Sequence, residues 1–368
     1  MKIAVFTFID AQNYGSKLQS YALYKYLTDL GHYVDYISVK NKNVFDCLRF
    51  LYNKLVNEKI YSIINKNVRK KKRAMVTSNA KKIDYNVSAI TVENFGKHIK
   101  VVGHYDLKKL NRIYDAFICG SDQVWSPLRI PLLKYYFLTF AGRDKKMSYA
   151  ASFGVNELPG INRRILKYID DFKYISVREE SGRDIINRYL KRDSSVVVDP
   201  VFLLNRSQWT VFCRHYGYTQ KSGEYAFLFF LNKNDDVIFA IKRLMAKIKT
   251  EVRFIEDGHP EAFVSAIANA KYVFTDSFHA TAFSVIFEKE FYCFERNIDS
   301  TIQQKSRLLC LLNRLGIENR YLTSFDDRLF DNSAICYDEV NEALKKNIDA
   351  SKAFLSNTLE EIYDVKLS

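Results

Sequence analysis

The sequence predicts an α/β protein made of two Rossmann-like domains whose parallel sheets face a central cleft. Short apolar runs alternate along the chain with longer segments of helical periodicity, which is the pattern of parallel sheets covered by helices. The chain has 368 residues, more than the roughly 250–300 at which a single core stops growing. Polar clusters also recur directly after apolar runs, where open α/β sheets bind ligands.

The first half of the chain reads as a series of strands and helices. Residues 2–8 form an apolar run, residues 16–30 repeat apolar side chains at helical spacing, and Gly31 ends that helix before a second strand at 33–39. The same patterns predict strands at 114–119, 146–153 and 174–177, and helices at 162–171 and 179–190. We expect an N-terminal domain over residues 1–198.

A second series begins where Pro200 terminates a strand. Strands are predicted at 225–230, 252–255, 272–274 and 290–294, and helices at 235–248, 260–269, 306–315 and from 278 onward. These elements predict a C-terminal domain over residues 199–339. Apolar residues recur at helical spacing from 340 to 362, so residues 340–368 are expected to form a helix that crosses between the domains.

The formal net charge of +14 is concentrated in part in one segment. Six of the eight residues from Lys66 to Arg73 are basic, within a helical insertion expected over residues 41–98. An amphipathic helix beside such a cluster can lie on an anionic membrane surface, and a solvated helical insertion is the alternative. No nucleic-acid motif accompanies the charge, so nucleic acid is not an expected partner.

The six cysteines show no paired spacing, and the N-terminus reads as a first strand rather than a signal peptide. No apolar stretch approaches a membrane span. We therefore expect a cytoplasmic protein, with the basic segment as the means of a peripheral membrane contact. The histidines lack metal-ligand spacing, so no metal site is expected.

The polar turn from Thr275 to His279 separates a short apolar strand from a helix. Asp276 and Ser277 are residue types that cap helix N-termini, and such termini favour anions. His279 then lies in the first helical turn, where one imidazole beside an anion site indicates acid/base chemistry. A buried structural histidine is the alternative.

The loop after the first strand contains Asn13, Tyr14, Gly15 and Ser16. Gly15 permits close ligand approach, and the polar side chains can bind a neutral or anionic group. The alternative is a simple connection between a strand and a helix.

A second loop combines Ser121, Asp122, Gln123 and Trp125 after the strand at 114–119. Carboxylates, amides and aromatic rings are typical of sugar sites, and Asp122 can act as a general base. Helix capping by Ser121 and Asp122 is the alternative.

Two arginines are placed to bind an anion. Arg178 follows the strand at 174–177 and can clamp a carboxylate or phosphate, with an internal ion pair to Glu179 or a nearby aspartate as the alternative. Arg307 starts a helix after a polar stretch and can reach the cleft or remain a surface charge.

Seven short motifs, in this order, resemble those of the polysaccharide pyruvyl transferase family. They cover residues 1 to about 320 and include the segments at 13–23, 120–125, 148–154, 176–179, 199–201, 275–279 and 306–307. The resemblance implies a GT-B-like fold and transfer of an enolpyruvyl-derived group from phosphoenolpyruvate to a sugar, which gives a pyruvate ketal and phosphate. The family acts on capsule, exopolysaccharide and cell-wall glycans, often as lipid-linked repeat units.

The resemblance also implies roles for residues of this chain. His279 is the candidate acid and Asp122 the candidate base or sugar-orienting group. Arg178, Arg307, Asp276 and Ser277 are expected to bind the donor, and the two polar loops the acceptor. Phosphoenolpyruvate is a co-substrate, so no cofactor is implied.

One departure from the family pattern concerns the donor. Many members carry Arg-Leu-His where this chain has Ser277, Phe278 and His279, so Arg307 or Lys17 replaces that arginine, or the donor differs. The alternatives are a GT-B glycosyltransferase that uses a nucleotide sugar, and a glycan-binding protein without catalysis.

Overall fold

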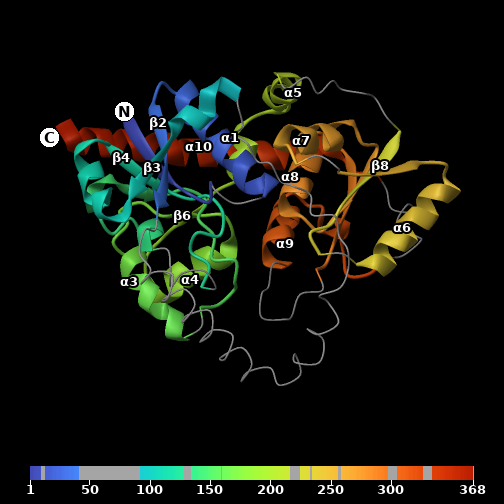
Figure 1. The fold of residues 1–368 in the computed structure, drawn as a ribbon. Helices are drawn as coiled ribbons and strands as arrows, with labels where there is room; N and C mark the ends of the chain where they lie inside the picture. Colours follow the sequence, from blue (N-terminus) through green and yellow to red (C-terminus); the bar gives the residue numbers. More distant parts are fainter. Residues whose placement is uncertain are drawn as a thin grey trace.

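The computed structural model describes residues 1–9, 13–40, 92–127, 134–158, 160–215, 224–232, 234–255, 258–296, 305–325 and 334–367. Two five-stranded parallel sheets lie side by side, each with helices packed against it (Figure 1). The prediction of an α/β protein with parallel sheets is therefore confirmed. Most of the basic insertion, including Lys66–Arg73, lies outside the described residues.

The N-terminal sheet has the strand order β3-β2-β1-β4-β5. Its strands are β1 (Lys2–Phe6), β2 (Tyr33–Lys40), β3 (Ile99–Gly103), β4 (Ala116–Cys119) and β5 (Lys146–Ser148). Isolated bridges join it to a small sheet of β6 (Ser176–Val177) and β7 (Ser195–Val196). The order of strands reverses between β1 and β4, which is where such sheets bind ligands.

The helices of this half are α1 (Tyr14–Asp29), α3 (Leu166–Ile169) and α4 (Glu180–Leu190). The Asn13 side chain caps α1 by accepting from the Gly15 and Ser16 amides, and Gly31 adopts φ 84° where the chain leaves the helix. The described 3₁₀-helices are η2 (Val92–His98), η3 (His104–Arg112), η5 (Lys134–Phe137), η6 (Arg143–Lys145), η7 (Gly160–Ile165), η8 (Pro200–Leu203) and η9 (Glu318–Arg320).

The C-terminal sheet has the order β12-β11-β10-β8-β9. Its strands are β8 (Tyr225–Phe229), β9 (Glu251–Phe254), β10 (Tyr272–Thr275), β11 (Glu290–Phe294) and β12 (Tyr321–Leu322). The helices are α5 (Arg206–His215), α6 (Asp235–Lys247), α7 (Pro260–Asn269), α8 (Phe278–Ile286) and α9 (Lys305–Arg314). Here the order reverses between β8 and β10, so the turn after β10 lies at the second reversal point.

One apolar core joins the two halves. Tyr14 in α1 stacks on Phe263 in α7 with ring centroids 4.9 Å apart, and Tyr21 contacts Phe212 in α5 at 4.8 Å. All four rings are buried. Burial of large aromatic surfaces of this kind stabilises an interface by several kcal/mol in total, so it holds the starts of α1 and α8 close together.

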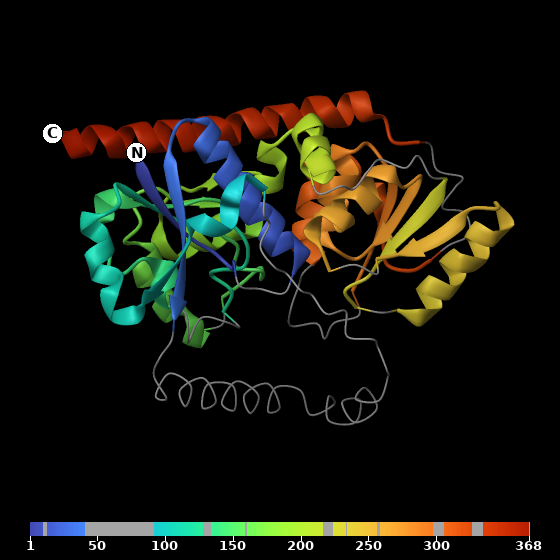
Figure 2. The same ribbon diagram turned by 45° about the horizontal axis from the view of Figure 1, so that its top comes forward.

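The long helix α10 (Tyr337–Leu367) lies along both halves (Figure 2). At one end Asn341 donates to Glu288 in the C-terminal half, and at the other Lys366 pairs with Asp115 at 2.9 Å in the N-terminal half. The domain boundary at residue 198/199 stays a prediction. Among the described residues no helix is both long enough and apolar enough to cross a membrane.

Candidate active site

Asp199 occupies the centre of the junction between the two halves. It precedes η8, and its Oδ1 accepts from the Val201 amide, which fixes the carboxylate at the start of that helix. Its Oδ2 accepts from Arg178 Nη1 at 2.5 Å and from Ser121 Oγ at 3.4 Å. The same oxygen lies 3.7 Å from His279 Nε2. Asp199 therefore links side chains from both sheets.

Arg178 lies among three carboxylates. Besides Asp199 it approaches Asp122 and Glu179, each with a nitrogen–oxygen distance of 3.8 Å, and its guanidinium stacks over the Phe278 ring at 4.7 Å. The alternative of an internal ion pair is thus realised in the structure. Burial opposes the charged form, but Asp199, Asp122 and Glu179 raise the pKa of Arg178 above its ordinary value.

His279 projects from the first turn of α8 onto the first turn of α1. Its side chain is 12% exposed. A Cβ atom built on Gly15 would lie 1.9 Å from His279 Nδ1, so only glycine at this position leaves room for the imidazole. The structure brings His279 in α8 and Gly15 in α1 together, although they are distant in the sequence and their helices pack against different sheets.

Asp122 follows β4 and completes the site on the side of α1. Its Oδ2 accepts from Ser16 Oγ at 2.8 Å and its Oδ1 from the Gln123 amide. Burial raises the pKa of Asp122, but Arg178, His279 and Arg307 outweigh that effect and hold it below its ordinary value. Asp122 is therefore a carboxylate at neutral pH.

Arg307, in the first turn of α9, lies within electrostatic reach of Arg178 and Asp122. Burial, followed by repulsion from Arg178, lowers the pKa of Arg307 to about 10. Arg307 Nε and Arg178 Nε and Nη2 are buried and have no hydrogen-bond partner among the described residues. An anion bound between these groups would complete their hydrogen bonding and reduce their mutual repulsion.

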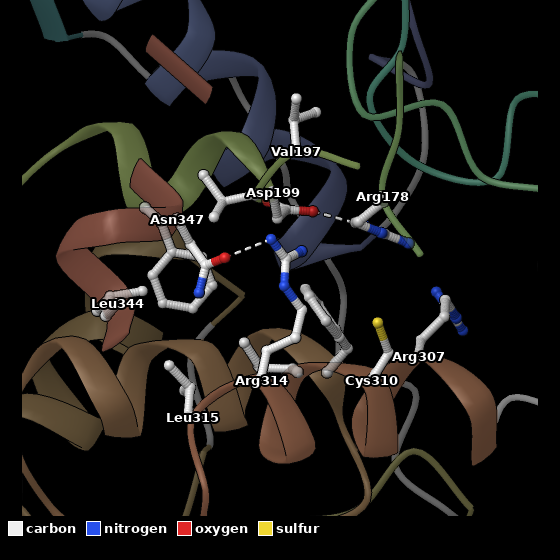
Figure 3. Close-up of a pocket in the computed structure, with 13 residues that line it drawn as sticks. Arg178, Val197, Asp199, Arg307, Cys310, Arg314, Leu315, Leu344 and Asn347 are labelled. Carbon is white, nitrogen blue, oxygen red and sulfur yellow. Dashed lines mark hydrogen bonds and ion pairs between the residues drawn. The ribbon is translucent and has the colours of Figure 1, made fainter. Parts of the chain in front are cut away.

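Behind these groups lies a cavity of about 30 Å³, lined in part by Arg178, Asp199 and Arg307 (Figure 3). It has room for only a few water molecules. A group much larger than water does not fit within this cavity.

Two residues expected to contact the acceptor are placed elsewhere. Trp125 is fully buried in the N-terminal core, where it packs against Phe153 and Phe172. Tyr14 is buried against Phe263. These two sequence expectations are wrong, because both rings are part of the apolar core and present no face to a sugar.

Other predicted site residues hold the backbone in place. Asn13 caps α1, and Ser277 caps α8 by accepting from the Ala280 amide. The Asp276 carboxylate accepts from the Leu231 and Asn232 amides, which ties the end of β8 to the end of β10. Its carboxylate also lies 3.3 Å from Arg296 Nε, and direct binding of the donor by Asp276 stays a prediction.

Asp199 and Arg296 lie at the site but are not among the residues that the sequence predicts there. The signal for Asp199 was an aspartate followed by proline directly after an apolar run, which is typical of a helix start. Arg296 follows β11, its Nε donates to the Asp276 carbonyl at 2.9 Å, and its charge acts on Arg307. Gln123 and Lys17 are partly exposed, and their roles stay predictions.

Among the described residues no three His, Cys, Asp or Glu side chains are grouped as a metal site would require.

Comparison with known proteins assigns the chain to a family. The family model for polysaccharide pyruvyl transferases matches residues 13–297. The chain belongs to the polysaccharide pyruvyl transferase family. Membership supports a transferase that moves a pyruvyl group onto a polysaccharide, and a glycan acceptor is consistent with that role. The matched range contains every residue of the site described above except Arg307.

The fold of this family member, two parallel α/β sheets side by side, is similar to that of a solved structure. UDP-GlcNAc 2-epimerase from Neisseria meningitidis is 10% identical with a TM-score of 0.50, over 98% of this chain and 100% of that one. The wall teichoic acid polymerase TagF is 11% identical with a TM-score of 0.43, over 99% and 88%. The N-terminal domain of Candida albicans trehalose-6-phosphate phosphatase is 9% identical with a TM-score of 0.44, over 98% and 96%. A search of curated protein sequences finds no match to this chain.

Replacement of Asp199 by asparagine is expected to make the free energy of unfolding depend less on pH in the acid range. Burial raises the pKa of Asp199, but His279 and Arg178 outweigh it and hold the pKa well below its ordinary value. A carboxyl whose pKa is depressed on folding stabilises the protein above its unfolded pKa, and that contribution is lost as pH falls toward its folded pKa. In Asp199→Asn the free energy of unfolding should be lower by about 1.5–3 kcal/mol at pH 7.

Urea unfolding at pH 7, 5, 4 and 3, followed by circular dichroism, checks this expectation. The difference between wild type and Asp199→Asn should narrow below about pH 4, where the wild-type carboxylate begins to lose its advantage. A constant difference at all four pH values would show that the charge of Asp199 does not stabilise the fold.

Proposed function

We propose that this protein transfers the pyruvate moiety of phosphoenolpyruvate onto two hydroxyl groups of a glycan, forming a pyruvate ketal and releasing phosphate. The observation that carries the proposal is the convergence of His279, Arg178 and Arg307 around Asp199, where buried nitrogen atoms of the two arginines lack a described hydrogen-bond partner. A small dianion supplies the acceptors that these groups need.

Donor binding is assigned to Arg178 and Arg307. The guanidinium of Arg178 is held by Asp199, so its Nε and Nη2 point to a fixed position and are pre-organised for a carboxylate or phosphate. Arg307 approaches from α9 of the other half. We assign to these two arginines the anchoring of both charged groups of phosphoenolpyruvate.

The reaction begins with proton transfer from His279 to the methylene carbon of the enol. The Asp199 carboxylate, 3.7 Å from Nε2, orients the imidazole for this transfer. One sugar hydroxyl adds to the cationic carbon, the bond to phosphate breaks, and the second hydroxyl closes the ketal. The two hydroxyl groups release two protons. One replaces the proton that His279 gave to the methyl group, and the other leaves with phosphate.

Asp122 is assigned to orientation of the acceptor. A general base works best with a pKa near the working pH, whereas the pKa of Asp122 is depressed. Its carboxylate accepts from Ser16 at the start of α1 and can accept from a sugar hydroxyl beside it. This favours the orienting role over the role of base, the two alternatives that the sequence left open.

Replacement of Arg307 by glutamine is expected to weaken binding of phosphoenolpyruvate about 10-fold, because one charge-assisted hydrogen bond is lost. Isothermal titration of both proteins with phosphoenolpyruvate measures the change. Arg206→Gln is the matched control, since Arg206 is an exposed arginine paired with Glu288 away from the site. Equal affinity of Arg307→Gln and wild type would remove Arg307 from the donor site.

A donor screen separates the proposed function from the alternatives. A bound donor raises the melting temperature by mass action, so phosphoenolpyruvate should stabilise the wild type whereas UDP- and CDP-sugars should not. Stabilisation by a nucleotide sugar alone would point to a glycosyltransferase. Stabilisation by glycans alone, without turnover of either donor, would point to a glycan-binding protein.

A further inference from the structure

Helix α10 is bonded to the backbone next to Asp199. Ser351 is fully buried, and its Oγ accepts from the Val198 amide at 2.9 Å. The hydroxyl in turn donates to the Asn347 carbonyl at 2.7 Å, which fixes its orientation. Since Val198 directly precedes Asp199, Ser351 holds the chain that carries the central carboxylate.

The same face of α10 is bonded to the helix that carries Arg307. Asn347 Oδ1 accepts from Arg314 Nη2 at 2.5 Å, and Asn347 Nδ2 donates to the Ala343 carbonyl, so the amide orientation is fixed. Arg314 is the last residue of α9 and Arg307 lies in its first turn. Two helical turns separate them, so a shift of Arg314 along the helix axis moves Arg307 as well.

Asn347 and Ser351 are four residues apart and therefore neighbours on one face of α10. Figure 3 shows the Arg314–Asn347 bond and the Arg178–Asp199 bond on two sides of the same small cavity. Both bonds therefore adjoin one cavity of about 30 Å³. One face of α10 is thus bonded both to the backbone beside Asp199 and to the helix that carries Arg307.

We propose that Asn347 and Ser351 are positioning residues, which set the distance between the Asp199–His279 pair and Arg307. Ser351 holds Val198 and thereby the Asp199–His279 pair, which is assigned to proton transfer. Asn347 holds Arg314 and thereby Arg307, which is assigned to donor binding. The two residues touch no substrate and act only through these neighbours. This inference rests on the proposed function, because it assigns separate roles to the two sides.

Steady-state phosphate release with phosphoenolpyruvate and a glycan acceptor tests the inference. In Asn347→Ala the KM for phosphoenolpyruvate should rise about 10-fold with kcat within about twofold, because ground-state binding is affected. In Ser351→Ala kcat should fall about 10-fold with KM within about twofold, since misplacement of the acid slows chemistry. Asn347→Asp keeps an acceptor for Arg314 and should restore the wild-type KM.

Asn341→Ala is the matched control, because Asn341 bonds α10 to Glu288 on the surface and away from the site. It should leave kcat and KM unchanged. Wild-type kcat and KM in both Asn347→Ala and Ser351→Ala would overturn the positioning roles. So would equal losses of activity in the two variants that follow their melting temperatures. A wild-type protein that does not turn over phosphoenolpyruvate would instead overturn the proposed function, on which this inference depends.

Discussion

Replacement of His279 by glutamine is expected to lower phosphate release from phosphoenolpyruvate by about 10²–10⁴-fold, the usual contribution of a general acid. Glutamine retains a polar side chain near Asp199 and Gly15 but cannot deliver a proton to carbon. Binding of phosphoenolpyruvate should change little, because the arginines and not the imidazole carry that function. Phosphate release with saturating donor and acceptor, together with titration of the donor, measures both quantities.

The matched control is His104→Gln, since His104 is exposed at the start of η3, where its ring contacts the exposed Tyr105. This variant should have wild-type activity. Circular dichroism and thermal unfolding verify that both variants are folded. Turnover by His279→Gln within a few-fold of wild type would remove His279 from the reaction and leave it as a buried structural histidine.

Replacement of Gly15 by alanine is expected to lower kcat about 100-fold, through a displacement of the imidazole by about 1 Å or more. The new methyl group would lie 1.9 Å from His279 Nδ1, a separation that requires the ring to move. Alanine is also the better helix former, so helix propensity does not oppose the substitution in α1. The variant should therefore remain folded while its activity falls.

Gly142→Ala provides the control, because a Cβ at Gly142 meets no atom within 4 Å and its φ of −62° suits alanine. It should leave kcat unchanged. The double variant Gly15→Ala/His279→Gln separates the two effects further, since little activity should be lost beyond that of His279→Gln. Additive losses, or full activity in Gly15→Ala, would show that the contact with Gly15 does not position the imidazole.

Elements with strong local signals could be predicted from the sequence. The apolar run at β10 and the capping residues after it indicate a strand that leads into a helix N-terminus, and α8 begins at Phe278 with Ser277 as its cap. Helix α10 likewise follows from apolar residues at helical spacing. Such signals are local, so they place His279 correctly without any knowledge of what lies opposite.

Short edge elements could not be predicted in the same way. β3 has no buried residue, and β12 has only two residues. Neither carries an apolar run, and each is a strand only because a neighbour, β2 or β11, offers its backbone. The 3₁₀-helix η2 lies at the end of the expected helical insertion, and β3 follows it where no strand was expected.

The misplaced aromatic residues have a related cause. Trp125 lies in a polar loop motif, and its neighbours in the sequence suggest a sugar platform. Phe153 and Phe172, which cover it, come from other parts of the chain. Composition cannot separate a ring that covers the core from a ring that faces a ligand. The membrane contact through Lys66–Arg73 and the domain boundaries stay predictions.

We propose above all that this family member joins the pyruvate moiety of phosphoenolpyruvate to a glycan as a pyruvate ketal. The most direct test of this proposal is incubation of the wild type with phosphoenolpyruvate and the lipid-linked repeat unit of the source cells, followed by mass spectrometry and NMR of the glycan. We expect one equivalent of phosphate and a glycan that has gained pyruvate less one water, with a methyl signal on a ketal carbon, and no product with His279→Gln. An unchanged glycan, or transfer of a sugar from a nucleotide donor in the same assay, would contradict the account.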